Sequence, residues 1–173
     1  MTLTGPRVTL RPGHYDDAVR LNAILAEPSV AQWWGDPDSV EAIVGELAGS
    51  DTAMLLVIEI DGEVAGGIQY HEEDEPMYRH AGIDLYLSTR FQGRGAGPEA
   101  VSLLAGYLFE ARGHHRLTID PAAANSRAIR CYAKVGFRPV GLMRQYERGP
   151  GGEFHDGLLM DLLRHELADG RLA

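Results

Sequence analysis

The sequence predicts a mixed α/β (α+β) fold, organised as a single domain over residues 1–173. The chain has 173 residues, of which 45% are hydrophobic, enough for one domain with a substantial core. Segments with strand-like alternation and segments with helical periodicity follow one another in the order β-α-α-β-β-β-α-β-α-β-β. We find no internal repeat, linker or low-complexity segment. We therefore expect a mixed, mostly antiparallel sheet flanked by helices.

The first fifty residues predict one strand and two helices. The strand alternates apolar and polar side chains before a Pro-Gly turn. Both helices carry apolar residues mostly at helical spacing, and the first has Asp16 and Asp17 in its opening turn. Pro28 is expected to end that helix, and residues 30–37 are expected to be a loop or a short turn of helix. The predicted ranges are 8–11 for the strand and 15–26 and 39–47 for the helices.

The middle of the chain predicts three consecutive strands. Asp61-Gly62 separates the first two and is typical of a tight hairpin turn. The acidic segment 71–76 is expected to connect the second strand to the third as a loop. The predicted strands are residues 53–60, 63–70 and 81–87.

The last part of the chain predicts helices alternating with strands. A helix is expected over residues 97–111, with Gly97 at its N-cap and Gly113 closing it. Asn125 suits the N-cap of a second helix, which Gly136 would end. The remaining strands are predicted over residues 116–120, 137–145 and 154–163, the last two forming a hairpin.

The net charge indicates which classes of ligand the protein can bind. Sixteen basic and 25 acidic side chains give a net charge of −9. This argues against nucleic-acid binding, which needs a basic face. It favours a cationic substrate, although acidity that only supports solubility explains the charge equally well.

Composition also indicates the compartment. No apolar run approaches the roughly 20 residues that a membrane span needs, and the N-terminus lacks the features of a signal peptide. Cys131 is the only cysteine, so no intrachain disulfide is possible and a reducing cytoplasm is expected. The histidines show no metal-ligand spacing, and no metal site is expected. We expect a cytoplasmic protein that binds neither nucleic acid nor membrane.

The run Gln92-Gly93-Arg94-Gly95-Ala96-Gly97 follows the strand predicted over residues 81–87 and opens a helix. Glycines allow close approach of backbone to phosphate, and the free N–H groups of a helix start bind anions. A Walker loop would need Gly-Lys-Ser/Thr, and a dinucleotide fingerprint would need glycine in place of Pro98. The remaining pattern, Gln-x-x-Gly-x-Gly, is weak alone, and a plain strand-to-helix turn would also explain it. Its position after the strand favours a diphosphate-bearing cofactor.

A second segment follows, with the pattern Asn-x-x-Ala-x-x-x-Tyr-x-x-x-Gly-Phe from Asn125 to Phe137. Each residue alone suits an ordinary capped helix. In this order and separation, the two segments resemble the coenzyme A site of the GNAT superfamily of acyltransferases. The resemblance implies acetyl-CoA as cofactor and a GNAT fold with splayed central strands. It also implies cofactor contacts from Leu85, Tyr86, Leu87, Gln92, Gly93, Arg94, Gly95, Ala96, Gly97, Asn125, Arg127 and Ala128. Arg90, Arg94, Arg127 and Arg130 concentrate positive charge that suits the phosphates, with a solvated helix face as the alternative for Arg130.

Acyl transfer from a thioester to an amine needs a base, donors for the oxyanion and an acid for the leaving thiolate. Asp84 lies in an apolar strand, where a carboxylate is costly unless it faces a cleft or a partner. It is our candidate base, and a structural hydrogen bond at a bulge is the alternative. By resemblance, this strand bulges and exposes the N–H of Leu85 or Tyr86 to the thioester. By the same resemblance, Tyr132 is the acid.

Several stretches resemble the aminoglycoside 6′-N-acetyltransferases, namely Val8-Thr9-Leu10-Arg11, Trp33-Trp34-Gly35, Gly82-Ile83-Asp84, and Asp120-Pro121 with the helix that follows. The resemblance implies that Trp33 or Trp34, together with Asp84 and Asp120, forms the acceptor site. Carboxylates and aromatic walls suit an amino sugar with several positive charges and apolar ring faces. One of the two tryptophans is expected to be core. The acidic run 72–75 would rim the cleft or be a solvated loop.

The C-terminal segment, residues 141–163, instead resembles the ribosomal-protein and amino-acid N-acetyltransferases. A peptide N-terminus is therefore the alternative acceptor. A non-catalytic coenzyme A-binding module is a third hypothesis, against which the intact Asp84 and Tyr132 argue. The sequence leaves both a monomer and a homodimer open.

Overall fold

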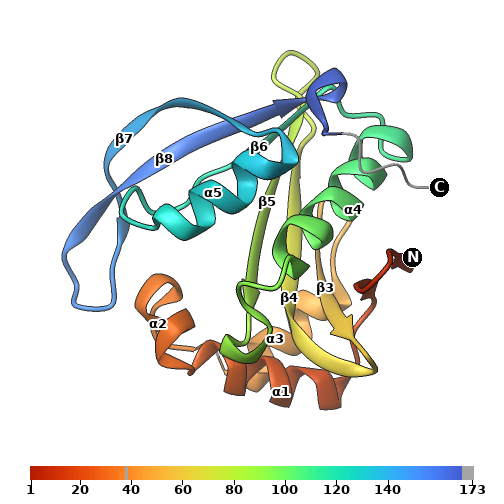
Figure 1. Cartoon of the computed structure of the whole chain (residues 1–173), viewed down its shortest axis with the longest axis vertical. Coiled ribbons are helices and arrows are strands. Elements are labelled where there is room, and N and C mark those ends of the chain that lie inside the picture. Colours follow the sequence, from red (N-terminus) through yellow and green to blue (C-terminus); the bar gives the residue numbers. More distant parts are fainter. Residues whose placement is uncertain (38, 169–173) are drawn as a thin grey trace.

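The computed structural model describes residues 1–37 and 39–168, and in them one eight-stranded sheet runs through the molecule (Figure 1). Its spatial order is β1-β2-β3-β4-β5-β6-β8-β7, and every neighbouring pair is antiparallel except β5 with β6. This is the mixed, mostly antiparallel sheet expected from the sequence. The strands are β1 (Leu3–Thr4), β2 (Thr9–Arg11), β3 (Ala53–Ile60), β4 (Glu63–Glu73), β5 (His80–Leu87), β6 (Arg116–Ile119), β7 (Arg138–Arg148) and β8 (Phe154–Leu163).

Local sequence chemistry sets the helix boundaries. Ser39 accepts a hydrogen bond from the N–H of Ala42 at 3.2 Å, and Asn125 accepts one from the N–H of Ala128 at 3.1 Å, so both act as the expected N-caps. Gly136 ends the last helix with a φ of 118°, which glycine adopts without strain. The helices are α1 (Tyr15–Leu25), α2 (Pro28–Trp34), α3 (Val40–Ala48), α4 (Ala96–Glu110) and α5 (Ser126–Val135), with 3₁₀ turns η1 (Thr89–Phe91) and η2 (Arg164–Glu166).

Helix α2 occupies the segment expected to be a loop or a short turn. Pro28 follows the end of α1, as expected, but it also takes the first position of α2. Proline suits that position because the N–H it lacks would have no helical partner there. The N-cap of α4 also differs from expectation, since Gly95, with a φ of 87°, precedes the helix and Gly97 lies inside it.

Strand β4 is longer than predicted, and the prediction of an acidic loop beginning at residue 71 is wrong. Residues 71–73 continue the strand and pair with residues 80–82 of β5. Glu72 is buried, and its carboxylate binds Arg112 and His114, each at 2.5 Å. A carboxylate can lie inside the fold when such partners satisfy it.

The two faces of the sheet hold separate clusters of apolar side chains, because alternate residues of a strand point to opposite faces. On one face, Leu56, Ile58 and Ile83 pack with residues of α4 such as Leu104. On the other face, Leu55, Val57 and Tyr86 pack with residues of α1 and α3, among them Leu21, Ile24 and Ile43. Asp84 pairs with Gln69 and lies on the same face as Tyr86.

The central strands β5 and β6 part after a short contact. They pair in parallel at Ala81 with Leu117 and at Gly82 with Thr118, while β5 continues to Leu87. The expected splay is confirmed. The expected bulge in β5 is wrong, because its register with β4 is unbroken from residues 80 to 87.

The bulge instead lies in β4, where the register with β3 shifts opposite Ile58 and Glu59. Beside it, a Cβ at Gly66 would come within 2.0 Å of the Tyr86 carbonyl oxygen, so this close approach requires glycine. Within residues 1–37 and 39–168, no helix has the length and apolarity that crossing a membrane demands.

Candidate active site

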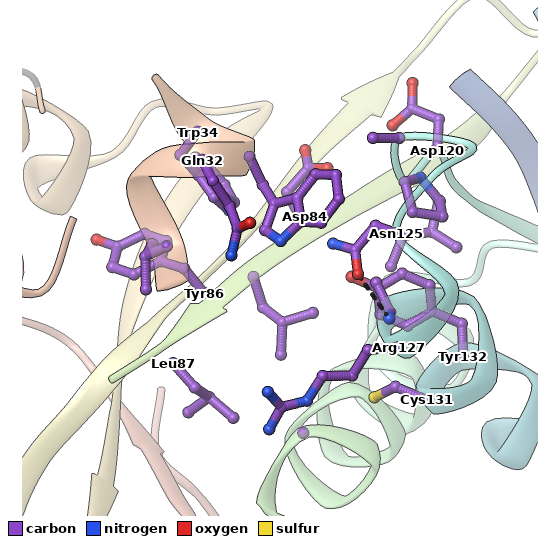
Figure 2. Close-up of a pocket in the computed structure, with 18 of the residues that line it drawn as sticks. Gln32, Trp34, Asp84, Tyr86, Leu87, Asp120, Asn125, Arg127, Cys131 and Tyr132 are labelled. Carbon is purple, nitrogen blue, oxygen red and sulfur yellow. Dashed lines mark hydrogen bonds between the residues drawn. The ribbon is translucent and has the colours of Figure 1, made fainter. Parts of the chain in front are cut away.

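A cleft of about 720 Å³ opens where β5 and β6 separate (Figure 2). Its walls come from α2, β5, the loop after β6, the start of α5 and strand β7. The residues predicted for catalysis and those predicted for acceptor binding, which come from separate parts of the sequence, lie together in this cleft. The candidate base Asp84, the candidate acid Tyr132 and the candidate acceptor residues Trp33, Trp34 and Asp120 all line this cleft.

Asp84 is half-buried on β5 and has a perturbed proton affinity. Burial and the charge of Asp120 raise the pKa of Asp84 from 3.8 to about 6, while His71 and a hydrogen bond from Gln69 oppose the rise. A carboxylate with this pKa is still mostly ionised at neutral pH. It is therefore able to accept a proton from a bound ligand.

Three carboxylates line the cleft together. Asp120 follows the last residue of β6, and Glu147 lies on β7. Burial and the charge of Asp120 raise the pKa of Glu147. Among the described residues, none of the salt bridges involves Asp84, Asp120 or Glu147. Arg127 and Arg148 also line the cleft, but they form no salt bridge with these carboxylates in the described part of the chain. The three carboxylates thus remain available to attract a cationic ligand.

Tyr146 also lines the cleft beside these carboxylates, and it was not predicted from the sequence. Its hydroxyl donates a hydrogen bond to Oδ2 of Asp120. The register of β7 with β8 shifts between Met143 and Glu147, and Gln145 has a φ of 49°, which is uncommon outside glycine. The N–H of Gln145 donates to Oδ1 of Asp156 at 2.8 Å. This bulge brings Tyr146 to the cleft.

The two tryptophans lie at the cleft end of α2, and both line its wall. The indole of Trp34 is 39% exposed and packs edge-on against Tyr86, with ring centroids 5.0 Å apart and planes at 72°. Trp33 is half-buried. The expectation that one tryptophan is core is wrong, because α2 is short and buries only Val30.

Tyr132 lies on α5 across the cleft from Trp34 (Figure 2). Its side chain is 7% exposed. Burial raises the pKa of Tyr132 well above 10, and the neighbouring Cys131 and Asp84 raise it further. The hydroxyl therefore stays protonated at neutral pH, as a proton donor must.

The other end of the cleft has the features that a phosphate-bearing cofactor needs. The N-terminus of α4 is preceded by Gly93 and Gly95, with φ values of 75° and 87°, and it leaves backbone N–H groups without helical partners. The Arg127 guanidinium also lines the cleft and donates to Oε1 of Gln92 at 2.7 Å. The residues present therefore fit a coenzyme A diphosphate.

Most of the cofactor residues predicted from the sequence lie in the cleft wall, and some do not. Those in the wall are Leu85, Tyr86, Leu87, Gln92, Gly97, Asn125, Arg127 and Ala128. Gly93, Arg94, Gly95 and Ala96 are not part of the wall and form the loop before α4 and the first residue of that helix. Arg90 pairs with Glu63 at 2.5 Å instead of facing the cleft.

The acidic run 72–75 does not rim the cleft. Glu72 is buried against Arg112 and His114, because alternation along β4 directs it away from the face that carries Asp84. Within the described ranges, no group of three or more His, Cys, Asp or Glu side chains is placed to hold a metal ion.

Comparison with known proteins relates this arrangement to acetyltransferases. The family model described as "Acetyltransferase (GNAT) domain" matches residues 7–138. The chain is 29% identical over 160 residues to the aminoglycoside N(6′)-acetyltransferase type 1 of Klebsiella pneumoniae, covering 82% of this chain and 79% of that protein. It is 26% identical over 166 residues to the spermidine N(1)-acetyltransferase of Escherichia coli K12, covering 92% and 87%.

A solved structure agrees with these relationships. The structure of Mycobacterium smegmatis RimJ in complex with CoA-disulfide superposes with a TM-score of 0.84 at 25% identity. The match covers 98% of this chain and 88% of that one.

Proposed function

Because the chain belongs to the GNAT acetyltransferase family, whose members use acetyl-CoA, we propose that it acetylates a primary amine of a cationic small molecule, namely the 6′-amine of an aminoglycoside. The observation that carries this proposal is the set of Asp84, Asp120 and Glu147 around one cleft, none of which forms a salt bridge within the described residues. Three carboxylates suit an acceptor with several ammonium groups.

The aromatic side of the cleft supports the same class of acceptor. Trp34 presents a partly exposed indole that rests on Tyr86, so its ring has a fixed orientation. Such a ring packs against the apolar face of a sugar, and it also attracts ammonium groups. A polyamine sugar has both features, whereas a linear polyamine has only the charges.

In the proposed reaction, both substrates are bound together and the transfer is direct. Acetyl-CoA supplies the acetyl group as a thioester. Asp84 accepts a proton from the ammonium form of the acceptor, and the neutral amine then attacks the acetyl carbon. A C–N bond forms as the C–S bond breaks. The nitrogen gives up a second proton as it becomes an amide, and this proton replaces the one that Tyr132 gives to the departing sulfur. The raised pKa of Asp84 places the base close to neutral pH, where general bases are most effective.

Two further groups have proposed roles in this step. Tyr132 donates its phenolic proton to the departing sulfur, a role that its persistent protonation supports. The backbone N–H of Leu85 or Tyr86 stabilises the carbonyl oxygen as negative charge develops there. Both residues lie on the part of β5 beyond its contact with β6, where the backbone borders the cleft.

A peptide N-terminus is the second candidate acceptor. The resemblance of residues 141–163 to ribosomal-protein acetyltransferases favours it. The three carboxylates argue against a peptide acceptor, because a single N-terminal ammonium group would not pair with all of Asp84, Asp120 and Glu147.

A thiol-release assay tests the proposal. Acetyl-CoA turnover is followed with a thiol reagent in the presence of kanamycin, tobramycin, spermidine or N-terminal peptides. We expect turnover with the aminoglycosides and little with peptides. Turnover with peptides alone would replace the small-molecule acceptor with a protein one.

A further inference from the structure

A polar network joins α2 to the cofactor loop, and Glu27 is its central acceptor. Glu27 lies at the N-cap of α2, immediately before the helix that ends in Trp33 and Trp34. Its carboxylate accepts hydrogen bonds from the hydroxyl of Ser88 at 2.8 Å and from the N–H and hydroxyl of Thr89, both at 2.7 Å. Although burial acts in the opposite direction, these bonds lower the pKa of Glu27, so the acceptor is ionised and the bonds are charge-assisted.

The network continues from α2 towards the cofactor. The hydroxyl groups of Ser29 and Thr89 lie 2.6 Å apart. Nε2 of Gln92 donates to the Ser29 hydroxyl at 3.3 Å and to the Leu87 carbonyl oxygen at 2.7 Å, while Oε1 of Gln92 accepts from Arg127. Gln92 therefore contacts the tryptophan helix with one end of its amide and the arginine of α5 with the other.

We propose that Glu27 is a positioning residue that couples the cofactor loop to the tryptophan wall of the acceptor site. This inference rests on the proposed function for the identity of the two sites. A bound phosphate competes with Gln92 for Arg127, because a charge-assisted bond to an anion is stronger than one to a neutral amide. The Gln92 amide then reorients, and its hydrogen bond to the Ser29 hydroxyl changes. Glu27 transmits that change to α2 because it fixes the first turn of the helix to Ser88 and Thr89.

The chain contains its own reporter for this coupling. It has two tryptophans, and both lie in α2. Adenosine 3′-phosphate 5′-diphosphate, the nucleotide half of coenzyme A, has the phosphates but no arm that reaches the tryptophans. We expect it to change the tryptophan emission of the wild-type protein. In Glu27→Gln, that change should be largely lost while the calorimetric Kd of the nucleotide stays within about twofold.

Two matched variants separate positioning from general damage. Glu59→Gln removes another half-buried carboxylate, which pairs with Arg11 at 2.6 Å and does not line the cleft. This variant should keep the wild-type emission change. Ser29→Ala removes the hydroxyl that contacts both Thr89 and Gln92 and leaves Glu27 in place. Like Glu27→Gln, it should weaken the change in tryptophan emission. An unchanged response in both Glu27→Gln and Ser29→Ala would overturn the proposal.

Kinetics supply a second readout. With saturating acetyl-CoA, Glu27→Gln should raise the KM of the aminoglycoside on the order of tenfold with a smaller change in kcat, because the tryptophan wall is misplaced. Equal kcat and KM values in wild type and variant would contradict the proposal. The emission experiment uses no acceptor, so its result distinguishes failure of this coupling from failure of the aminoglycoside assignment.

Discussion

The Tyr146 hydroxyl donates a hydrogen bond to the Asp120 carboxylate, and this bond joins β7 to the loop that follows β6. It draws together two segments that the sequence separates by 26 positions. Asp120 in turn raises the pKa of Asp84 on β5 and of Glu147 on β7. The orientation of one carboxylate therefore influences the proton affinity of two others in the cleft.

Replacing Tyr146 with phenylalanine should weaken acceptor binding more than chemistry. Asp120 would lose its donor and its fixed orientation, and a hydrogen bond to a charged group is worth about 1.5–3 kcal/mol. We expect Tyr146→Phe to raise the acceptor KM about tenfold, with kcat changed less. Steady-state kinetics check this. A variant with wild-type KM would remove Tyr146 from the acceptor site.

Replacing Asp84 with asparagine should lower turnover by about 10²–10⁴-fold, the usual contribution of a general base. Acetyl-CoA affinity, measured by calorimetry, should remain near the wild-type value. In the wild type, activity should fall as the pH drops through about 6, because Asp84 becomes protonated. This limb of the pH–rate profile should be absent in the variant. An identical limb in both proteins would assign it to another group.

The same substitution should stabilise the fold at neutral pH. The folded-state pKa of Asp84 is raised, so the native state binds more protons than the unfolded state between pH 3.8 and about 6. Stability is therefore lost as pH rises through this window, and the ionised carboxylate costs on the order of 2 kcal/mol above it. Urea unfolding at pH 8 should show Asp84→Asn to be more stable than wild type. A less stable variant would indicate a structural role for the carboxylate.

Replacing Tyr132 with phenylalanine tests the proposed acid. The phenol is buried and remains protonated, so the variant loses a proton donor with little loss of apolar packing. We expect kcat to fall about 10²-fold or more, with acetyl-CoA binding retained. Rapid-quench measurement of the transfer step should show that this step, and not product release, is slower. Wild-type rates would reduce Tyr132 to a packing residue.

Glu72 provides a stability test away from the cleft. Burial raises its pKa, but hydrogen bonds from Arg112 and His114 outweigh burial and lower it. The carboxylate thus contributes stability above its unfolded pKa of 4.5, and this is lost as pH falls through the lower folded value. Glu72→Gln should destabilise the protein by about 3 kcal/mol at pH 7 and by less at pH 4.

A matched control for Glu72 lies at the end of α4. Glu110 pairs with Arg164 at 2.6 Å, but its side chain is 69% exposed. Because exposed ion pairs contribute little, Glu110→Gln should change the free energy of unfolding by less than about 0.5 kcal/mol. Equal effects of the two substitutions would show that Glu72 does not stabilise the core.

Features set by local chemistry could be predicted from the sequence. Asp61 and Gly62 form the expected hairpin turn, with φ values of 52° and 77°, because asparagine-like side chains and glycine tolerate that region. Ser39 and Asn125 cap their helices as expected. Asp84 could be singled out because an isolated carboxylate in an apolar strand needs an explanation.

Features set by distant contacts could not be predicted in this way. Burial of Glu72 depends on Arg112 and His114, which come from another part of the chain. Tyr146 reaches Asp120 only because a bulge interrupts β7, and the alternation in that segment gives no sign of it. One of Trp33 and Trp34 was predicted to be part of the core because the sequence does not show how little of α2 is buried.

Two aminoglycosides that differ only at the 6′ position, neomycin with an amine and paromomycin with a hydroxyl, separate 6′-acetylation from every other outcome. Thiol release from acetyl-CoA is measured with each, and the neomycin product is examined by NMR. We predict turnover of neomycin with acetylation at the 6′-nitrogen and negligible turnover of paromomycin. Equal turnover of both compounds, or acetylation at another amine, would contradict this prediction.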